Sequence, residues 1–109
     1  MNTYEVKLTK QAFNQMNFIV NYISKEIMAP DAASNLLNQI KEEIEKLTFL
    51  PKRYAIIDEE PWKSQEIRKI VVKNFLIYFW VNDSNNTVQV IAVIYNKRNQ
   101  LQQFSNINM

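Results

Sequence analysis

Residues 66–95 read EIRKIVVKNFLIYFWVNDSNNTVQVIAVIY, and this stretch decides the fold. Three runs rich in β-branched and aromatic side chains, at 66–73, 75–81 and 87–95, predict three strands. Asn74 alone separates the first two runs and can adopt the left-handed conformation of a tight turn. Residues 82–86 (NDSNN) supply the second turn. Connections this short predict an antiparallel meander.

The residues before this stretch predict one strand and two helices. Apolar and polar side chains alternate over 3–8, which is typical of a half-buried strand. Thr9 can cap a helix over about 10–28, and Pro30 begins a second helix that ends near Phe49, before Pro51. The helices carry apolar stripes at helical spacing, formed by Ala12, Phe13, Met16, Ile19, Val20, Ile23 and Ile27, and by Ala33, Leu36, Leu37, Ile40, Ile44 and Leu47. The short gap between the helices predicts an antiparallel hairpin, and the aperiodic residues 51–64 predict a loop.

The order strand, helix, helix, strand, strand, strand places the chain in the α+β class. We expect a single antiparallel sheet of about four strands packed on an α-helical hairpin. If every element reverses the chain, the strand at 3–8 runs antiparallel to the first and third meander strands and parallel to the second. The 109 residues fit one domain, 1–109, in which residues from about 96 onward form a polar C-terminal tail.

The predicted sheet has more apolar surface than two helices can cover. On the strand at 75–81 both faces are apolar, with Phe75, Ile77, Phe79 and Val81 opposed to Leu76, Tyr78 and Trp80. The strand at 87–95 opposes Val88, Val90, Ala92 and Ile94 to Ile91, Val93 and Tyr95. Three covers for the second face stay open: the 51–64 loop (Tyr54, Ile56, Ile57, Trp62), the tail (Leu101, Phe104, Ile107), or another chain. The third predicts self-association of the chain on its own.

Composition excludes several classes of site. The chain has no Cys, His or Gly, so disulfides, thiolate or imidazole zinc sites, Ser-His-Asp catalysis and glycine-rich phosphate loops cannot form. We expect no cofactor and no metal; the run Asp58–Glu60 is interpreted as a solvated loop. The net charge is +2, with the basic excess after residue 60. The longest apolar run is far shorter than the roughly twenty residues of a membrane span, so we expect a cytoplasmic protein without membrane contact.

Over residues 3–99 the chain resembles the RelE/ParE toxins of bacterial type II toxin–antitoxin modules. The resemblance rests on the strand Tyr4–Leu8, on Thr9-Lys10-Gln11-Ala12, on Leu50-Pro51, and above all on residues 67–78 (IRKIVVKNFLIY) and 93–98 (VIYNKR). It implies a helical hairpin on a small antiparallel sheet. It also implies a cognate antitoxin that wraps the toxin, which would account for the surplus apolar face.

The resemblance implies two alternative activities. RelE-like members cleave mRNA on the ribosome, and ParE-like members inhibit DNA gyrase. For the first activity it assigns Arg68 and Arg98 to catalysis; for binding of the substrate or target it assigns Lys69, Lys73, Tyr95, Lys97 and Phe104.

Two departures favour the ParE-like branch: Leu76 stands where RelE-like enzymes tend to have Arg, and Phe104 where they can have Tyr. A non-catalytic domain that only binds a partner is the third alternative. Two residues also have a structural interpretation. Arg68 would pair with Glu66 or with carboxylates of the second helix, and Trp62 would pack in the loop instead of stacking on a base.

Overall fold

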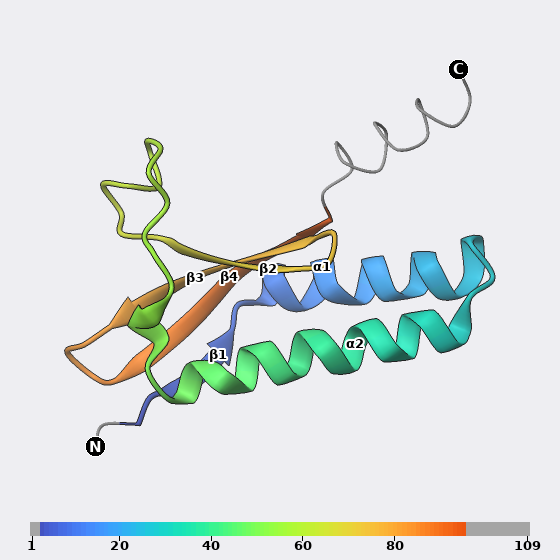
Figure 1. Ribbon diagram of the computed structural model, residues 1–109, viewed down its shortest axis with the longest axis horizontal. Helices are drawn as coiled ribbons and strands as arrows, with labels where there is room; N and C mark the ends of the chain where they lie inside the picture. Colours follow the sequence, from blue (N-terminus) through green and yellow to red (C-terminus); the bar gives the residue numbers. More distant parts are fainter. Residues whose placement is uncertain (1–2, 96–109) are drawn as a thin grey trace.

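The structure is a computed structural model that describes residues 3–95. It contains four strands and two α-helices (Figure 1). The elements are β1 (Glu5–Leu8), α1 (Lys10–Asn21) continued by a π-helical turn (Tyr22–Glu26), α2 (Pro30–Glu45) continued by a 3-10 turn (Lys46–Thr48), a second 3-10 turn (Pro51–Arg53), β2 (Arg68–Val72), β3 (Phe75–Asn82) and β4 (Thr87–Tyr95).

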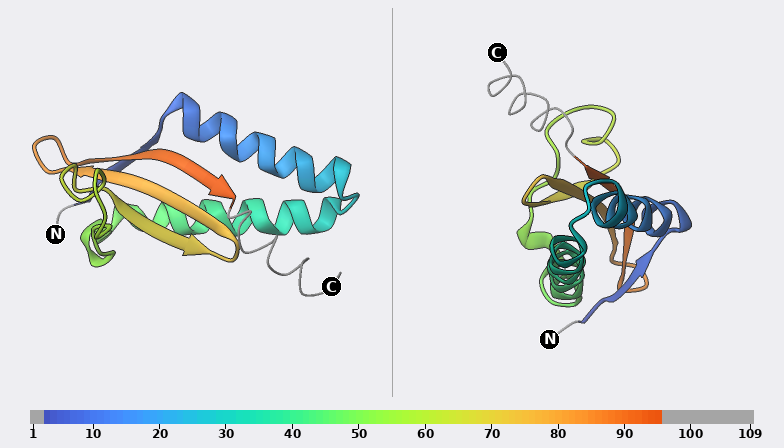
Figure 2. Two further views of the ribbon diagram at one scale, coloured as in Figure 1. Left: turned by 90° about the horizontal axis from the view of Figure 1, so that it is seen from above. Right: turned by 90° about the vertical axis from the view of Figure 1, so that its right-hand side faces the viewer.

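The predicted α+β architecture is confirmed. One four-stranded sheet has the order β1-β4-β3-β2, and the hairpin of α1 and α2 covers one of its faces (Figures 1 and 2). Thr9 caps α1 as predicted, since its hydroxyl accepts a hydrogen bond from the backbone N–H of Ala12 at 3.2 Å. Each helix buries one stripe, but Phe13 and Ile27, which were expected in the first stripe, are 51% and 47% exposed.

The predicted direction of the first strand is wrong, and the sheet is mixed. β1 pairs parallel with β4, whereas β2–β3 and β3–β4 are antiparallel. The prediction assumed a chain reversal between β1 and α1, but Thr9 caps the helix with no intervening loop. The backbone N–H of Thr9 donates to the carbonyl of Val90, and Gln15 accepts from the N–H of Val93. Helix α1 therefore continues along β4 in the direction of β1 (Figure 2).

A bulge in β4 changes which of its side chains face the helices. Tyr78 pairs with Ala92 and Phe79 pairs with Val90, so Ile91 is an extra residue in the ladder. Before the bulge Val88 and Val90 enter the core, and after it Val93 enters while Ile94 is 38% exposed. The strict alternation expected for β4 is thus wrong beyond Val90. On β3 the alternation holds, with Phe75, Ile77 and Phe79 buried.

The β2–β3 turn also differs in detail from the expectation. Lys73, and not Asn74, has the positive φ, at 52°. In the β3–β4 turn the left-handed residue is Asn86, with φ of 54°, within the predicted Asn-rich segment. Both strand connections are as short as predicted, so the meander that carries the site is confirmed.

Candidate functional site

The face of the sheet opposite the helices, called the outer face below, carries a row of apolar side chains across three strands. Val71 on β2 lies directly opposite Leu76 on β3, which lies directly opposite Ile94 on β4. Val71 is 63% exposed and Ile94 38% exposed, and Leu76 is half-buried. Neighbouring side chains in register on one sheet face form a continuous surface. The described residues therefore leave this apolar row open to solvent.

The neighbouring row on the outer face is partly covered by the 51–67 connection. Tyr78 lies between Lys69 on β2 and Ala92 on β4, and the ring of Trp62 packs on that of Tyr78 at 5.7 Å between centroids. Trp62 thus packs as a loop residue, in agreement with the structural role considered for it. Tyr54 contacts the other face, edge-on to Phe79 at 5.9 Å. The loop covers one row of the outer face and leaves the row of Val71 open.

Two predicted binding residues flank the apolar row. Lys69 precedes Val71 by two positions on the exposed edge strand β2, and Lys73 follows it in the turn. Both side chains are exposed, and within residues 3–95 neither forms an ion pair. The outer face therefore combines apolar side chains with unpaired cations. That chemistry suits a partner segment that presents apolar side chains beside carboxylates.

Arg68 has a structural role in the fold. Its guanidinium Nη1 donates to the backbone carbonyls of Lys52 at 3.2 Å and Tyr54 at 2.5 Å, while its backbone pairs with Ile56. These hydrogen bonds and the backbone pairing hold residues 52–56 against the start of β2. The expected ion pair with Glu66 or a carboxylate of α2 is not among the contacts of the described residues. Phosphate binding by this guanidinium would compete with two hydrogen bonds that hold the connection.

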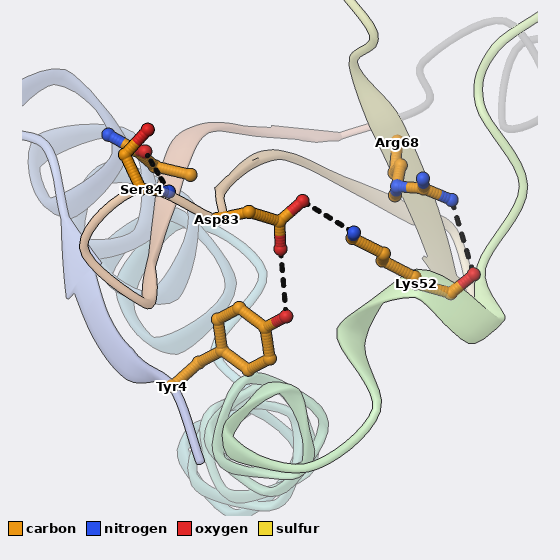
Figure 3. Close-up of polar contacts among 6 residues, drawn as sticks. Tyr4, Lys52, Arg68, Asp83 and Ser84 are labelled. Carbon is orange, nitrogen blue, oxygen red and sulfur yellow. Dashed lines mark hydrogen bonds and ion pairs between the residues drawn. The ribbon is translucent and has the colours of Figure 1, made fainter. Parts of the chain in front are cut away.

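A polar cluster at one end of the sheet was not predicted from the sequence. Asp83, in the β3–β4 turn, accepts a hydrogen bond from the Tyr4 hydroxyl at 2.9 Å and pairs with Lys52 at 2.5 Å (Figure 3). The hydrogen bonds from Lys52 and Tyr4 lower the pKa of Asp83, and the Asp83 carboxylate raises the pKa of both partners. The cluster joins three segments that are far apart in sequence. The only sequence signal was the polar composition of residues 82–86.

Tyr95, the last residue of β4, is held by packing on the helix side of the sheet. Its ring stacks on Phe75 at 4.9 Å between centroids, and burial raises the pKa of its hydroxyl. Packing and β-pairing therefore account for this residue, which was expected to bind the target. The other expected residues, Arg98, Lys97 and Phe104, lie outside the described part of the chain. The roles that the resemblance assigns to these three residues stay predictions.

Within residues 3–95 no group of three or more acidic side chains converges as a metal site would require. None of the helices in this part of the chain has the length and hydropathy needed to cross a membrane.

Comparison with known proteins agrees with this geometry. A family model described as the ParE toxin of the type II toxin–antitoxin system parDE matches residues 6–100. The chain is similar in structure to the chromosomal ParDE system of P. aeruginosa, with a TM-score of 0.69 and 18% identity over 85% of this chain and 96% of that one. It is also similar to the RelBE2 complex of Mycobacterium tuberculosis (TM-score 0.61, 14% identity, 87% and 93% covered).

A mutant of the E. coli toxin RelE in the free state gives a TM-score of 0.60 at 13% identity, covering 93% of this chain and 92% of that one. No curated protein sequence matches the chain significantly. At these identities the structural matches establish the shared fold, and the family model establishes the family.

Proposed function

The chain belongs to the ParE family of type II toxin–antitoxin toxins, and from this premise we propose that it arrests growth by binding DNA gyrase as a protein inhibitor. A cognate antitoxin is its partner in the module. The proposal chooses between the two activities that the family resemblance implied, gyrase inhibition and ribosome-dependent mRNA cleavage. It also places the site of action in the cytoplasm, where gyrase and its DNA are found.

The role of Arg68 is the observation that carries this choice. Cleavage of RNA through its 2′-hydroxyl requires cationic groups that stabilise the additional charge on the phosphate in the transition state. Arg68 is one of two arginines assigned to that task, and its guanidinium is engaged by the carbonyls of Lys52 and Tyr54. A guanidinium that donates hydrogen bonds to the backbone of a neighbouring loop is poorly placed to bind a phosphate during the reaction. This favours inhibition by binding over cleavage.

Leu76 supports the same choice. Where RelE-like enzymes tend to place an arginine, this side chain lies in the apolar row between Val71 and Ile94. An apolar side chain offers no hydrogen bond to a phosphate oxygen. The outer face at this point is thus suited to protein contact. We propose that the antitoxin docks there, with apolar side chains on the row of Val71 and with carboxylates at Lys69 and Lys73.

The test compares two reactions run with the same toxin preparation, released from its antitoxin complex. Purified gyrase with relaxed plasmid and ATP reports supercoiling, and a cell-free translation reaction with an end-labelled mRNA reports cleavage. The proposal predicts loss of supercoiling with intact mRNA, and added antitoxin restores supercoiling. Defined mRNA fragments with normal supercoiling would establish the ribosome-dependent endoribonuclease instead.

The oligomeric state provides a second test of the docking surface. An open apolar row predicts that the toxin without antitoxin self-associates, and that the antitoxin complex does not. Light scattering of both samples measures this. A toxin that neither inhibits gyrase nor cleaves mRNA, yet still binds antitoxin, would instead fit the third alternative, a domain that only binds a partner.

A further inference from the structure

The two edges of β2 have different neighbours. On one side β2 pairs with β3 along its whole length, and on the other it ends the strand order β1-β4-β3-β2 (Figure 2). The connection from α2 covers the start of this second edge, where Ile56 bridges Arg68. There the N–H of Ile57 also donates to the carbonyl of Ile67 at 2.9 Å. Within residues 3–95 no strand or bridge continues along residues 69–72, which we call the open β2 edge.

Two residues of the open β2 edge turn backbone hydrogen-bonding groups away from β3. In an antiparallel ladder, residues that bond to the neighbouring strand alternate with residues whose N–H and C=O point to the opposite edge. The carbonyl of Ile67 bonds on that opposite edge, so the alternation gives the same direction to the backbone groups of Lys69 and Val71. Within residues 3–95, no backbone hydrogen bond outside the ladder involves the carbonyl of Lys69 or either group of Val71. Such a row is matched by the backbone of another extended segment.

The side chains on the open β2 edge indicate the charge of that segment. Val71 is 63% exposed on the outer face, and Lys69 and Lys73 stand on either side of it along the chain. Neither ammonium group has an ion pair within residues 3–95. Opposite charges on neighbouring strands stabilise the pairing, and like charges destabilise it. A segment with an apolar side chain beside Val71 and carboxylates beside the two lysines is therefore complementary.

A second copy of this chain does not meet these requirements. Antiparallel pairing of two β2 edges about Val71 would set Lys69 of each copy against Lys73 of the other. Residues 69–73 contain no carboxylate that could neutralise these lysines. Lysine on an edge strand is a common means by which proteins oppose such pairing. The occupant of the edge is therefore a different chain that carries carboxylates.

From the free backbone groups and the flanking lysines we propose that an extended segment of the antitoxin joins the open β2 edge as a fifth strand. At every second position this segment presents an acidic, an apolar and an acidic side chain toward the outer face. Its apolar side chain lengthens the row of Val71, Leu76 and Ile94 by one strand, and its backbone bonds to that of Lys69 and Val71. This strand addition rests on the proposed function in one respect, that the antitoxin binds the outer face.

Amide hydrogen exchange, measured residue by residue by NMR on the full chain, tests the fifth strand directly. The N–H of Val71 should exchange fast in the free toxin, and at least about tenfold more slowly in the complex with purified antitoxin. The N–H of Ile70, which the alternation directs toward β3, is the internal control and is protected in both samples. A helix lying on the outer face would bond to no backbone group of the edge, so Val71 would then exchange as in the free toxin.

Substitutions at the edge give a second reading. Proline lacks the N–H and is tolerated on edge strands where that group faces away from the sheet, so Val71→Pro removes the donor and keeps the ladder with β3. Antitoxin affinity, measured by calorimetry, should fall at least about tenfold. Val71→Ile is the matched control, because it keeps the N–H and a β-branched apolar side chain, and its affinity should stay within about twofold of the wild type. Lys69→Glu should also weaken binding, and together with the exchange measurement it decides the question if Val71→Pro does not fold.

The outcomes separate the fifth strand from the docking on which it rests. Weaker antitoxin binding by Lys69→Glu, with unchanged exchange of Val71, would overturn the fifth strand and leave the antitoxin on the outer face. Wild-type affinity of both Val71→Pro and Lys69→Glu would overturn the strand and the docking together. Self-association that Val71→Pro abolishes, with antitoxin binding unchanged, would show that a second copy occupies the edge and would overturn the proposal. A toxin that leaves gyrase active, while Val71 is protected in the complex, would refute the gyrase target and support the strand.

Discussion

The side-chain carbonyl of Gln15 on α1 accepts a hydrogen bond from the backbone N–H of Val93 on β4, at 2.9 Å. β1 pairs with β4 only as far as Val90, so among residues 3–95 the edge of β4 beyond that point has no neighbouring strand. Gln15 satisfies one of the N–H groups that β1 leaves unpaired, and the Thr9 hydroxyl donates to the carbonyl of Ile91 at 3.3 Å. The first helix thus completes the sheet edge that the short first strand does not reach.

Replacing Gln15 with Ala should therefore destabilise the protein. The N–H of Val93 is partly buried, and leaving such a donor without an acceptor costs about 1–3 kcal/mol. Urea unfolding followed by circular dichroism measures the change in the free energy of unfolding. Gln11→Ala is the control, because Gln11 is exposed on the same helix and should change stability by no more than about 0.5 kcal/mol. Equal effects of the two substitutions would contradict the role of Gln15.

The β4 bulge predicts that substitutions at two adjacent residues destabilise the protein by different amounts. Val93 is 1% exposed in the core, whereas Ile94 is 38% exposed on the outer face. Val93→Ala should lower the free energy of unfolding by about 2 kcal/mol, and Ile94→Ala by about 0.5 kcal/mol or less. Urea unfolding of both variants reports the difference. A regular strand would give the reverse order, because strict alternation from Val90 would place Ile94 in the core.

These two cases show what the sequence could and could not predict. Period two on residues 75–81 identified the core side chains of β3, and helical spacing identified the buried stripes of α1 and α2. The bulge at Ile91 was not predictable from residue types, because Val, Ile and Ala are equally compatible with either face. The parallel pairing of β1 with β4 was missed because Thr9 can cap the helix in either case. The same residue serves whether the chain reverses after the strand or continues in the direction of the strand.

The candidate site, like the fold, was predicted only in part. Surplus apolar surface on the meander indicated the outer face, and the open row of Val71, Leu76 and Ile94 lies there. The hydrogen bonds of Arg68 to the carbonyls of Lys52 and Tyr54 depend on the path of the 51–67 connection. That path has no periodicity from which it could have been predicted. The left-handed conformation of Leu50 was equally unpredictable, since leucine is not a residue that favours it.

The Asp83 cluster predicts a specific dependence of stability on pH. The pKa of Asp83 in the folded protein is below its ordinary value of 3.8, so the folded state favours the carboxylate. Its stabilising contribution is complete above 3.8 and is lost as the pH falls through the lowered value. The urea midpoints of wild type and Asp83→Asn should therefore differ at neutral pH and converge in acid.

The control for that comparison is Glu59→Gln, an exposed carboxylate of the 51–67 connection that should leave the midpoint unchanged at either pH. High salt should reduce the effect of Asp83→Asn, because both side chains of the Lys52–Asp83 pair are about half exposed. A midpoint difference that persists unchanged into strong acid would show that the Asp83 carboxylate is not its source.

The outer face predicts the effect of a charge at Val71. Val71→Asp places a carboxylate at the β2 end of the apolar row, where a partner would have to bury it, so antitoxin affinity should fall by about 100-fold. Isothermal titration calorimetry with the purified antitoxin measures this. Because Val71 is 63% exposed, stability should hardly change. An antitoxin affinity equal to that of the wild type would place the antitoxin elsewhere.

The role of Arg68 tests the central claim, that this toxin acts by contact and that Arg68 serves the fold. The direct measurement is the concentration of folded Arg68→Gln protein that halves gyrase supercoiling, determined beside its free energy of unfolding. Loss of the hydrogen bonds to Lys52 and Tyr54 should lower stability by about 1.5–3 kcal/mol. We predict that the potency per folded molecule stays within about twofold of the wild type. A variant of wild-type stability that no longer inhibits would contradict the account, because Arg68 would then act on the target and not on the fold.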